Sequence, residues 1–143
     1  MDEFSISSPM PLNKLRGVTQ FQRRALKRLR ITTTAQLFRA VHTAEGLCDL
    51  AERSQVREEE LVSIIHRADM ARVNGVGAVF GDMLIMLDVV SLRQLMDQDP
   101  ADLHARLSAL NQQERLARRS PTPEEVESWI DQAKSLPPAT KWT

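Results

Sequence analysis

The chain has 143 residues, of which 42% are hydrophobic, and its one cysteine, Cys48, excludes an intramolecular disulfide framework and a thiolate metal site. The 19 basic and 19 acidic side chains cancel, so net charge alone does not favour indiscriminate binding to nucleic acid. No apolar stretch reaches the roughly 18–20 residues that cross a bilayer, and the first residues lack the pattern of a secretory signal. These features predict a cytoplasmic protein that does not enter a membrane.

The charged residues are unevenly distributed along the chain. Residues 4–44 contain no Asp or Glu but eight Lys and Arg, and therefore carry +8. Residues 45–143 contain 11 basic and 17 acidic side chains, or −6, and Asp2 and Glu3 supply the remaining −2. A polarised distribution of this kind is typical of a protein that meets a charged partner.

Apolar residues recur with the period of a helix along most of the chain, and no sustained alternation of apolar and polar residues predicts a strand. Several helix starts carry capping signals: Thr33-x-x-Gln36, Ser91-x-x-Gln94, Thr122-x-x-Glu125 and Asp99-Pro100. The sequence predicts an all-α fold with helices near residues 20–30, 34–42, 44–53, 57–73 (with a break near Ala68), 78–88, 92–98, 100–113 and 123–135.

The chain resembles itself at an offset of 58 residues. When Gly17 is placed over Gly75, nine further pairs match: Leu15/Val73, Val18/Val76, Phe21/Val79, Leu26/Leu84, Leu29/Leu87, Ile31/Val89, Thr33/Ser91, Gln36/Gln94 and Leu37/Leu95. Later residues match at an offset of 65: Glu60/Glu125, Leu61/Val126, Ile64/Trp129, Ile65/Ile130 and Ala68/Ala133. We expect a duplication with units at 11–67 and 68–136, packed as one compact domain between a flexible tail at 1–10 and a tail at 137–143.

The second unit is predicted to contain a turn between two helices, with the sequence Asn74-Gly75-Val76-Gly77. In a helix-hairpin-helix motif such glycines adopt a positive φ, the apolar residue between them packs into the core, and the N–H groups at the next helix start bind a phosphate. The alternative is that the glycines only allow close helix packing. The next helix is apolar on most sides, with Asp82 as an early carboxylate, so we expect it to be buried between the units or at a homodimer interface.

The first unit has the opposite pattern. Its turn, Arg16-Gly17-Val18-Thr19, lacks a second glycine, but the following helix carries four cations at one-turn spacings: Arg23, Arg24, Lys27 and Arg28. Like charges at this spacing repel by roughly a few tenths of a kcal/mol per pair, which favours an anionic partner such as a nucleic-acid backbone. The alternatives are a solvated face or pairing with Glu58-Glu59-Glu60. Phe21, Ala25, Leu26 and Leu29 are predicted to face inward.

No constellation typical of catalysis or metal binding is evident. His42, His66 and His104 are far apart in the sequence, and no nucleotide-binding glycine loop or nucleophile elbow occurs. A second small basic cluster, formed by Arg115, Arg118 and Arg119, is either a phosphate contact or a solvated loop. We therefore predict no catalytic residue, no metal and no cofactor.

One family shares these patterns over residues 12–137. The chain resembles domain-of-unknown-function family 4332 in three segments: 68–77 (Ala-Asp-Met-Ala-Arg-Val-Asn-Gly-Val-Gly), 89–95 (Val-Val-Ser-Leu-Arg-Gln-Leu), and Leu103 to Pro137 with Asn111, Arg118, Arg119, Pro121, Trp129 and Lys134. The resemblance implies duplicated helix-hairpin-helix units, similar to those of DNA repair proteins and of the C-terminal domain of the RNA polymerase alpha subunit. It implies no established activity. The family often has lysine where this chain has Asn74.

The sequence thus predicts a non-enzymatic module that binds DNA, or RNA, through backbone phosphates without strong sequence preference. The predicted contacts are Arg16, Gly17, Thr19, Arg23, Arg24, Lys27 and Arg28 in the first unit and Asn74, Gly75, Val76 and Gly77 in the second. The alternative is a protein-interaction or self-association module, in which the basic helix meets an acidic partner or the chain forms a homodimer.

Overall fold

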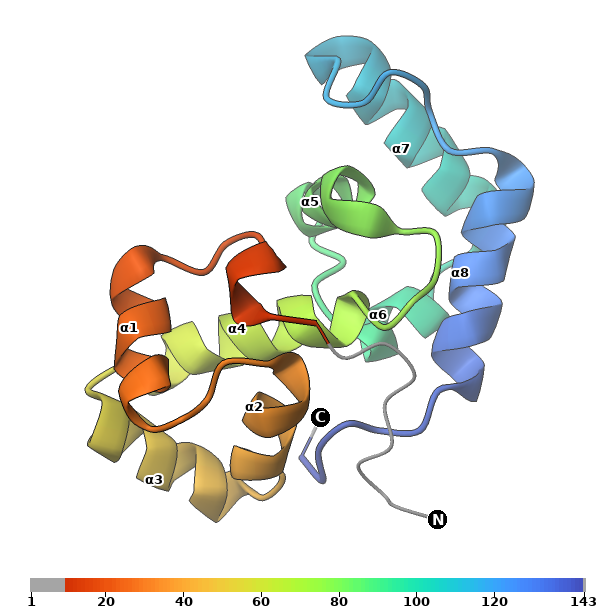
Figure 1. Cartoon of the computed structure of the whole chain (residues 1–143). Coiled ribbons are helices and arrows are strands. Elements are labelled where there is room, and N and C mark those ends of the chain that lie inside the picture. Colours follow the sequence, from red (N-terminus) through yellow and green to blue (C-terminus); the bar gives the residue numbers. More distant parts are fainter. Residues whose placement is uncertain (1–9, 143) are drawn as a thin grey trace. The chain divides into compact units, whose positions relative to one another are not determined.

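A computed structural model of the chain describes residues 10–142 and shows an all-α fold, which confirms the predicted class (Figure 1). After a short 3-10 helix, η1 (Leu12–Lys14), these residues form α1 (Gln20–Arg28), α2 (Thr34–Ala40), α3 (Ala44–Ser54), α4 (Glu58–Met70), α5 (Gly77–Met86), α6 (Leu92–Met96), α7 (Pro100–Glu114) and α8 (Pro123–Ser135). Residues 1–9 of the predicted N-terminal tail, and Thr143, lie outside the described residues. None of the described helices has the length and apolar character needed to span a bilayer.

The helix starts show which capping predictions were right. Thr33 and Thr122 each form the reciprocal pair of hydrogen bonds with the residue three positions on. At Ser91 only half of the predicted box forms: its Oγ accepts from the N–H of Gln94 at 3.2 Å. The side chain of Gln94 instead accepts from the N–H of Val90 at 2.8 Å. The helix predicted over 57–73 has no break near Ala68 and ends at Met70.

The chain divides into two compact units. One comprises the chain up to Ala68 together with the segment that begins at Pro137, and the other spans Asp69–Leu136. The segment predicted as a C-terminal tail makes defined contacts with the first unit: Lys141 donates its N–H to the carbonyl of His42 at 2.9 Å. Trp142 donates its indole N–H to the carbonyl of Val41 at 2.7 Å.

In the first unit, α3 packs against α1 and α2 (Figure 1). Among the described residues of this unit the buried core is mostly aliphatic, and its fully buried members include Leu26, Leu37, Phe38, Leu50, Leu61 and Ile65. The segment before η1 is held to the start of α2, because Leu12 donates to the carbonyl of Thr32 at 2.8 Å and Thr34 donates to that of Met10 at 2.9 Å. An isolated antiparallel bridge joins Pro11 and Thr33.

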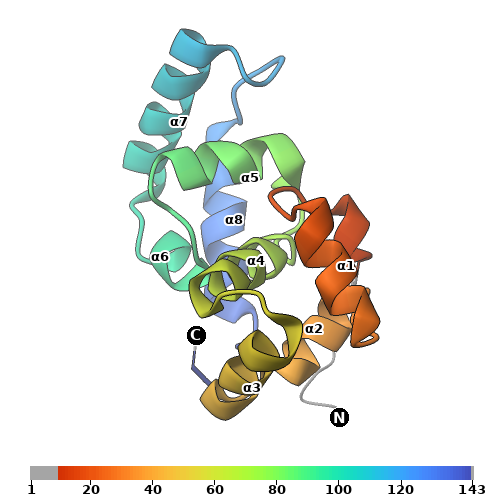
Figure 2. The same cartoon turned by 90° about the vertical axis from the view of Figure 1, so that its left-hand side faces the viewer.

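In the second unit, α8 packs against α6 and α7, and α5 packs against α7 (Figure 2). Trp129 of α8 is 1% exposed, and its ring lies 5.4 Å from that of Phe80. The expectation that α5 is buried between the units or at a homodimer interface stays a prediction. Only Met83 and Leu84 of this helix are buried, and Met86 is 52% exposed.

Candidate functional site

The two helices that follow the predicted turns end in the same way. Ile31 donates its N–H to the carbonyl of Leu26 at 3.0 Å, and 58 residues later Val89 donates to that of Leu84 at 2.9 Å. The residue just before each donor, Arg30 in the first case and Asp88 in the second, has φ of 64°. The same local structure therefore occurs at both sets of positions that the sequence repeat aligned.

The first turn starts α1 with a capping box that the sequence analysis missed. Gly17 has φ of 81°, and Val18 behind it is buried. Thr19 Oγ1 accepts from the N–H of Gln22 at 3.1 Å, and Gln22 Oε1 accepts from the N–H of Thr19 at 2.9 Å. The signal, Thr19-x-x-Gln22, has the spacing of the boxes that were predicted. The N–H of Thr19 is therefore already bonded within the capping box.

A basic side chain from another helix covers this turn. A Cβ on Gly17 would collide with the side chain of Arg67 in α4. Arg67 was not among the predicted contacts, although the offset of 65 residues aligns it with Gln132. Arg67 therefore joins Arg16 as a second arginine at the first turn.

The second turn has the predicted backbone. Gly75 and Gly77 have φ of 94° and 68°, and Val76 between them is only 2% exposed. A Cβ on Gly75 would lie 3.3 Å from the indole nitrogen of Trp129. The positive φ favours glycine at position 75, and the ring leaves little room for a Cβ there.

A glutamine from α8 holds the start of this second turn. Gln132 Oε1 accepts from the N–H of Asn74 at 2.8 Å, and Gln132 Nε2 donates to the carbonyl of Asn74 at 3.0 Å. Both backbone groups of Asn74 therefore have partners within the unit. Gln132 occupies the position that Arg67 has in the first unit, so corresponding residues cover the two turns, one with an amide and one with a cation.

The exposed face of α1 carries cations without carboxylate partners. Arg24, Lys27 and Arg28 are exposed, and none has an ion pair or side-chain hydrogen bond with any residue in 10–142. Pairing between α1 and the acidic run at 58–60 was one of the alternatives. Instead, two carboxylates of that run lie near Arg57, with N–O distances of 3.8 Å to Glu59 and 3.5 Å to Glu60.

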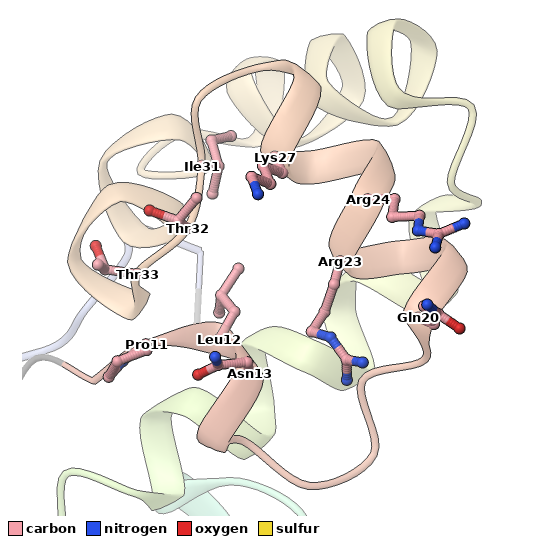
Figure 3. Close-up of a pocket in the computed structure, with 10 residues that line it drawn as sticks. All are labelled: Pro11, Leu12, Asn13, Gln20, Arg23, Arg24, Lys27, Ile31, Thr32 and Thr33. Atoms are coloured by element: carbon pink, nitrogen blue, oxygen red, sulfur yellow. The ribbon is translucent and has the colours of Figure 1, made fainter.

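Three cations of α1, Arg23, Arg24 and Lys27, line one pocket. Its volume is about 550 Å³, and it lies between the start of the chain's described part, α1 and the segment before α2 (Figure 3). The lining residues, none of them acidic, are Pro11, Leu12, Asn13, Gln20, Arg23, Arg24, Lys27, Ile31, Thr32 and Thr33. Figure 3 shows Lys27 pointing into the hollow and Arg24 pointing away from it. Arg23 is oriented by a 3.0 Å hydrogen bond from its guanidinium to the carbonyl of Val18.

The prediction that Phe21 faces inward was wrong. Phe21 is 63% exposed, whereas Ala25 and Leu26 are buried as predicted and Leu29 is half-buried. Successive residues of a helix advance by about 100°, so Gln22, rather than Phe21, lies on the side of Leu26 and Leu29. Gln22 takes this inward position, with 7% exposure, because its amide closes the capping box at Thr19.

The small basic cluster of the second unit is partly neutralised. Arg119 forms two hydrogen bonds with the Glu125 carboxylate, at 2.6 and 3.1 Å, and lies 5.7 Å above the ring of Phe80. The guanidinium and the N–H of Thr122 lower the pKa of Glu125 from 4.5 to about 2. Arg115 and Arg118 are exposed. Arg119 is thus engaged in holding the start of α8.

Comparison with known proteins gives one match. Residues 16–136 match the family described as "Domain of unknown function (DUF4332)", and the chain belongs to this family. No curated protein matches the chain. No solved structure matches it either.

Proposed function

We propose that the chain is a non-enzymatic module of two tandem helix-hairpin-helix units, and that its first unit binds DNA or RNA through backbone phosphates without strong sequence preference. The duplication is supported by the hydrogen bonds that recur 58 residues apart at the ends of α1 and α5. The observation that carries the binding proposal is the face of α1, where Arg24, Lys27 and Arg28 are exposed and lack carboxylate partners within residues 10–142.

Charge makes an anionic polymer the best partner for this face. Cations one turn apart repel one another, and in a folded protein this repulsion is commonly relieved by a neighbouring carboxylate. Here a row of phosphates would relieve it, because each phosphate contact releases counterions and gains affinity without reading a base. A binding mode of this kind depends on charge spacing and therefore has little sequence preference.

The two turns would make unequal contributions. At the first, Arg16 and Arg67 add charge next to Gly17, while the N–H of Thr19 is already used within the capping box. At the second, the backbone of Asn74 is bound by Gln132, so Gly75, Val76 and Gly77 would supply at most a neutral backbone contact. We therefore place the main contact surface on the first unit.

Fluorescence anisotropy with labelled oligonucleotides of about 20 nucleotides, as duplex and as single strand, tests the proposal. Binding should weaken steeply between about 50 and about 200 mM salt. On duplex DNA, the logarithm of the association constant should fall against the logarithm of the salt concentration with a slope near −0.9 per contacted phosphate. Absence of binding to either oligonucleotide at the lower salt concentration would refute the proposal.

A matched pair of charge reversals locates the surface. The first variant combines Arg24→Glu, Lys27→Glu and Arg28→Glu, and leaves Arg23 in place because it bonds to Val18. The second combines Arg93→Glu, Arg118→Glu and Lys134→Glu, three exposed residues of the second unit, and makes the same change in net charge. The first should weaken binding by at least about 100-fold at low salt and the second by a few-fold. Equal losses would show that only net charge matters.

A second candidate, self-association through α5, is favoured by a different observation. Met86 of α5 is 52% exposed and Met96, at the end of α6, is 36% exposed, although both are large apolar side chains. Methionine is common at adaptable protein interfaces. Multi-angle light scattering should give a dimer for the native chain and a monomer for Met86→Glu if this candidate is right. A monomer at all concentrations would exclude it.

A further inference from the structure

Binding to a duplex backbone requires only a row of cations. The pocket beside α1 also contains neutral polar and apolar residues. Its lining combines three cations with four neutral polar residues, Asn13, Gln20, Thr32 and Thr33, and with the apolar Pro11, Leu12 and Ile31. At about 550 Å³ it lies within the range of roughly 300–1,000 Å³ that is typical of small-ligand sites. A hollow with an apolar floor can receive a sugar or a base together with its phosphate.

The hollow is held open by local structure. One wall, η1, is tied to the opposite segment by the hydrogen bond from Leu12 to the carbonyl of Thr32, at 2.8 Å. The other wall is α1, from which Lys27 points into the space (Figure 3). Leu12 and Ile31 are only 2% and 7% exposed, so they form a floor and not a rim. This arrangement places a cation over an apolar surface.

An exposed aromatic ring lies on the same helix. Phe21 is 63% exposed and precedes Arg24 by three residues and Arg28 by seven, spacings that bring side chains to one side of a helix. Unpaired bases stack on exposed aromatic rings between cations, and this contact tolerates every base. In a duplex the base faces are stacked on one another and are not accessible to such a ring.

We propose that the first unit prefers single-stranded nucleic acid over duplex. One nucleotide enters the pocket, with its phosphate near Lys27 and Arg23 and its sugar or base against Leu12 and Ile31. A neighbouring base stacks on Phe21. This inference rests on the proposed function, because it assigns the class of nucleic acid that the same basic surface takes.

The test compares three labelled ligands whose strands have equal length, at one low salt concentration: a single strand, a single strand with abasic sites throughout, and a blunt duplex. The native chain should bind the single strand at least about fivefold more tightly than the duplex and about tenfold more tightly than the abasic strand. Phe21→Ala should lose about tenfold in affinity for the single strand and keep its affinity for the abasic strand within about twofold.

Leu116→Ala is the matched control, because it also truncates an exposed apolar side chain, in the second unit. It should leave all three affinities unchanged. Circular dichroism checks that both variants keep the helical content of the native chain, as expected for exposed positions.

Three results would overturn the preference while leaving the proposed function intact: equal binding of single strand and duplex, equal binding of normal and abasic strands, or no effect of Phe21→Ala on the single strand. Absence of binding to all three ligands would instead remove the proposed function, and this inference with it. The two failures are therefore distinguishable in one set of titrations.

Discussion

The helices that follow the two turns, α1 and α5, end with the same hydrogen bonds but have different surfaces. Each of three cations in α1 is replaced by an acidic or apolar residue in α5: Arg24 by Asp82, Lys27 by Ile85 and Arg28 by Met86. The buried apolar positions stay apolar: Leu26 corresponds to Leu84 and Ala25 to the larger Met83, and all four side chains are buried. Packing constrains the inward positions, whereas solvent-facing positions can diverge without a large effect on stability.

The residues that cover the two turns also differ in charge between the units. Arg67 lies on Gly17, and Gln132 binds the backbone next to Gly75. The first unit therefore places a cation where the second places a neutral amide. In the first unit the turn adds to a basic surface. In the second it is held by an indole ring and a glutamine, which supports a structural role for that turn.

The largest expected effect comes from removing the ring that supports the second turn. Trp129→Ala should lower the free energy of unfolding by about 3–5 kcal/mol, because a fully buried aromatic side chain leaves a cavity. Urea denaturation followed by circular dichroism measures the loss. Hydrogen exchange should also quicken at Gly75 and Gly77. Unchanged exchange there would show that the ring does not support the turn.

Substituting alanine for two turn glycines distinguishes two costs: the strain of a positive φ, and a clash of the new Cβ with a covering side chain. Gly17→Ala and Gly77→Ala both force alanine into a positive φ, at a cost of about 1–2 kcal/mol. Position 77 has open space around a Cβ, but at position 17 the side chain of Arg67 must also move. Gly17→Ala should therefore lower the melting temperature more than Gly77→Ala. Equal decreases would mean that Arg67 adjusts at no cost.

The contact of the C-terminal segment with the first unit should have a smaller effect. Trp142→Phe removes the indole donor to the carbonyl of Val41 but keeps an aromatic ring. One hydrogen bond contributes about 0.5–1.5 kcal/mol, so thermal unfolding should show a decrease of that size. Lys141→Ala is the control, because Lys141 bonds to His42 through its backbone N–H. Equal stability of Trp142→Phe and the native chain would contradict the assigned role of the indole.

The smallest effect is expected from the ion pair at the start of α8, and it should depend on pH. Glu125→Gln keeps an acceptor for the capping box but removes the charge that faces Arg119. Because the folded-state pKa of Glu125 is lowered from 4.5 to about 2, its stabilisation is present above about pH 4.5 and is lost as the pH falls through about 2. At neutral pH the melting temperature should fall by no more than about 2 °C, since both groups are partly exposed.

The native chain and Glu125→Gln should therefore converge in stability as the solution is acidified towards about pH 2. Melting temperatures measured over that range check the sign. A difference that grows on acidification would contradict it.

Helix boundaries and caps could be predicted from the sequence because their signals lie within a few residues of one another. The helix starts at Thr33, Asp99 and Thr122 are as predicted. The sequence repeat at 58 residues aligned the ends of α1 and α5, which form equivalent hydrogen bonds. The exposure of Phe21 was missed because its neighbour Gln22 turns inward to cap the helix. Apolar character alone did not show which of the two residues faces the core.

By itself, the sequence determined the all-α class, the helix positions, the glycine turns and the concentration of positive charge in residues 4–44. Only the tertiary structure decided which cations line a pocket and which residues cover the turns. Arg67 lies 50 residues from Gly17, and Gln132 lies 58 from Asn74, so neither pair has a local signal. The floor of the pocket likewise joins Leu12 to Ile31 across an entire helix. Local periodicity determines each helix, but the contacts between segments distant in sequence depend on how those helices pack.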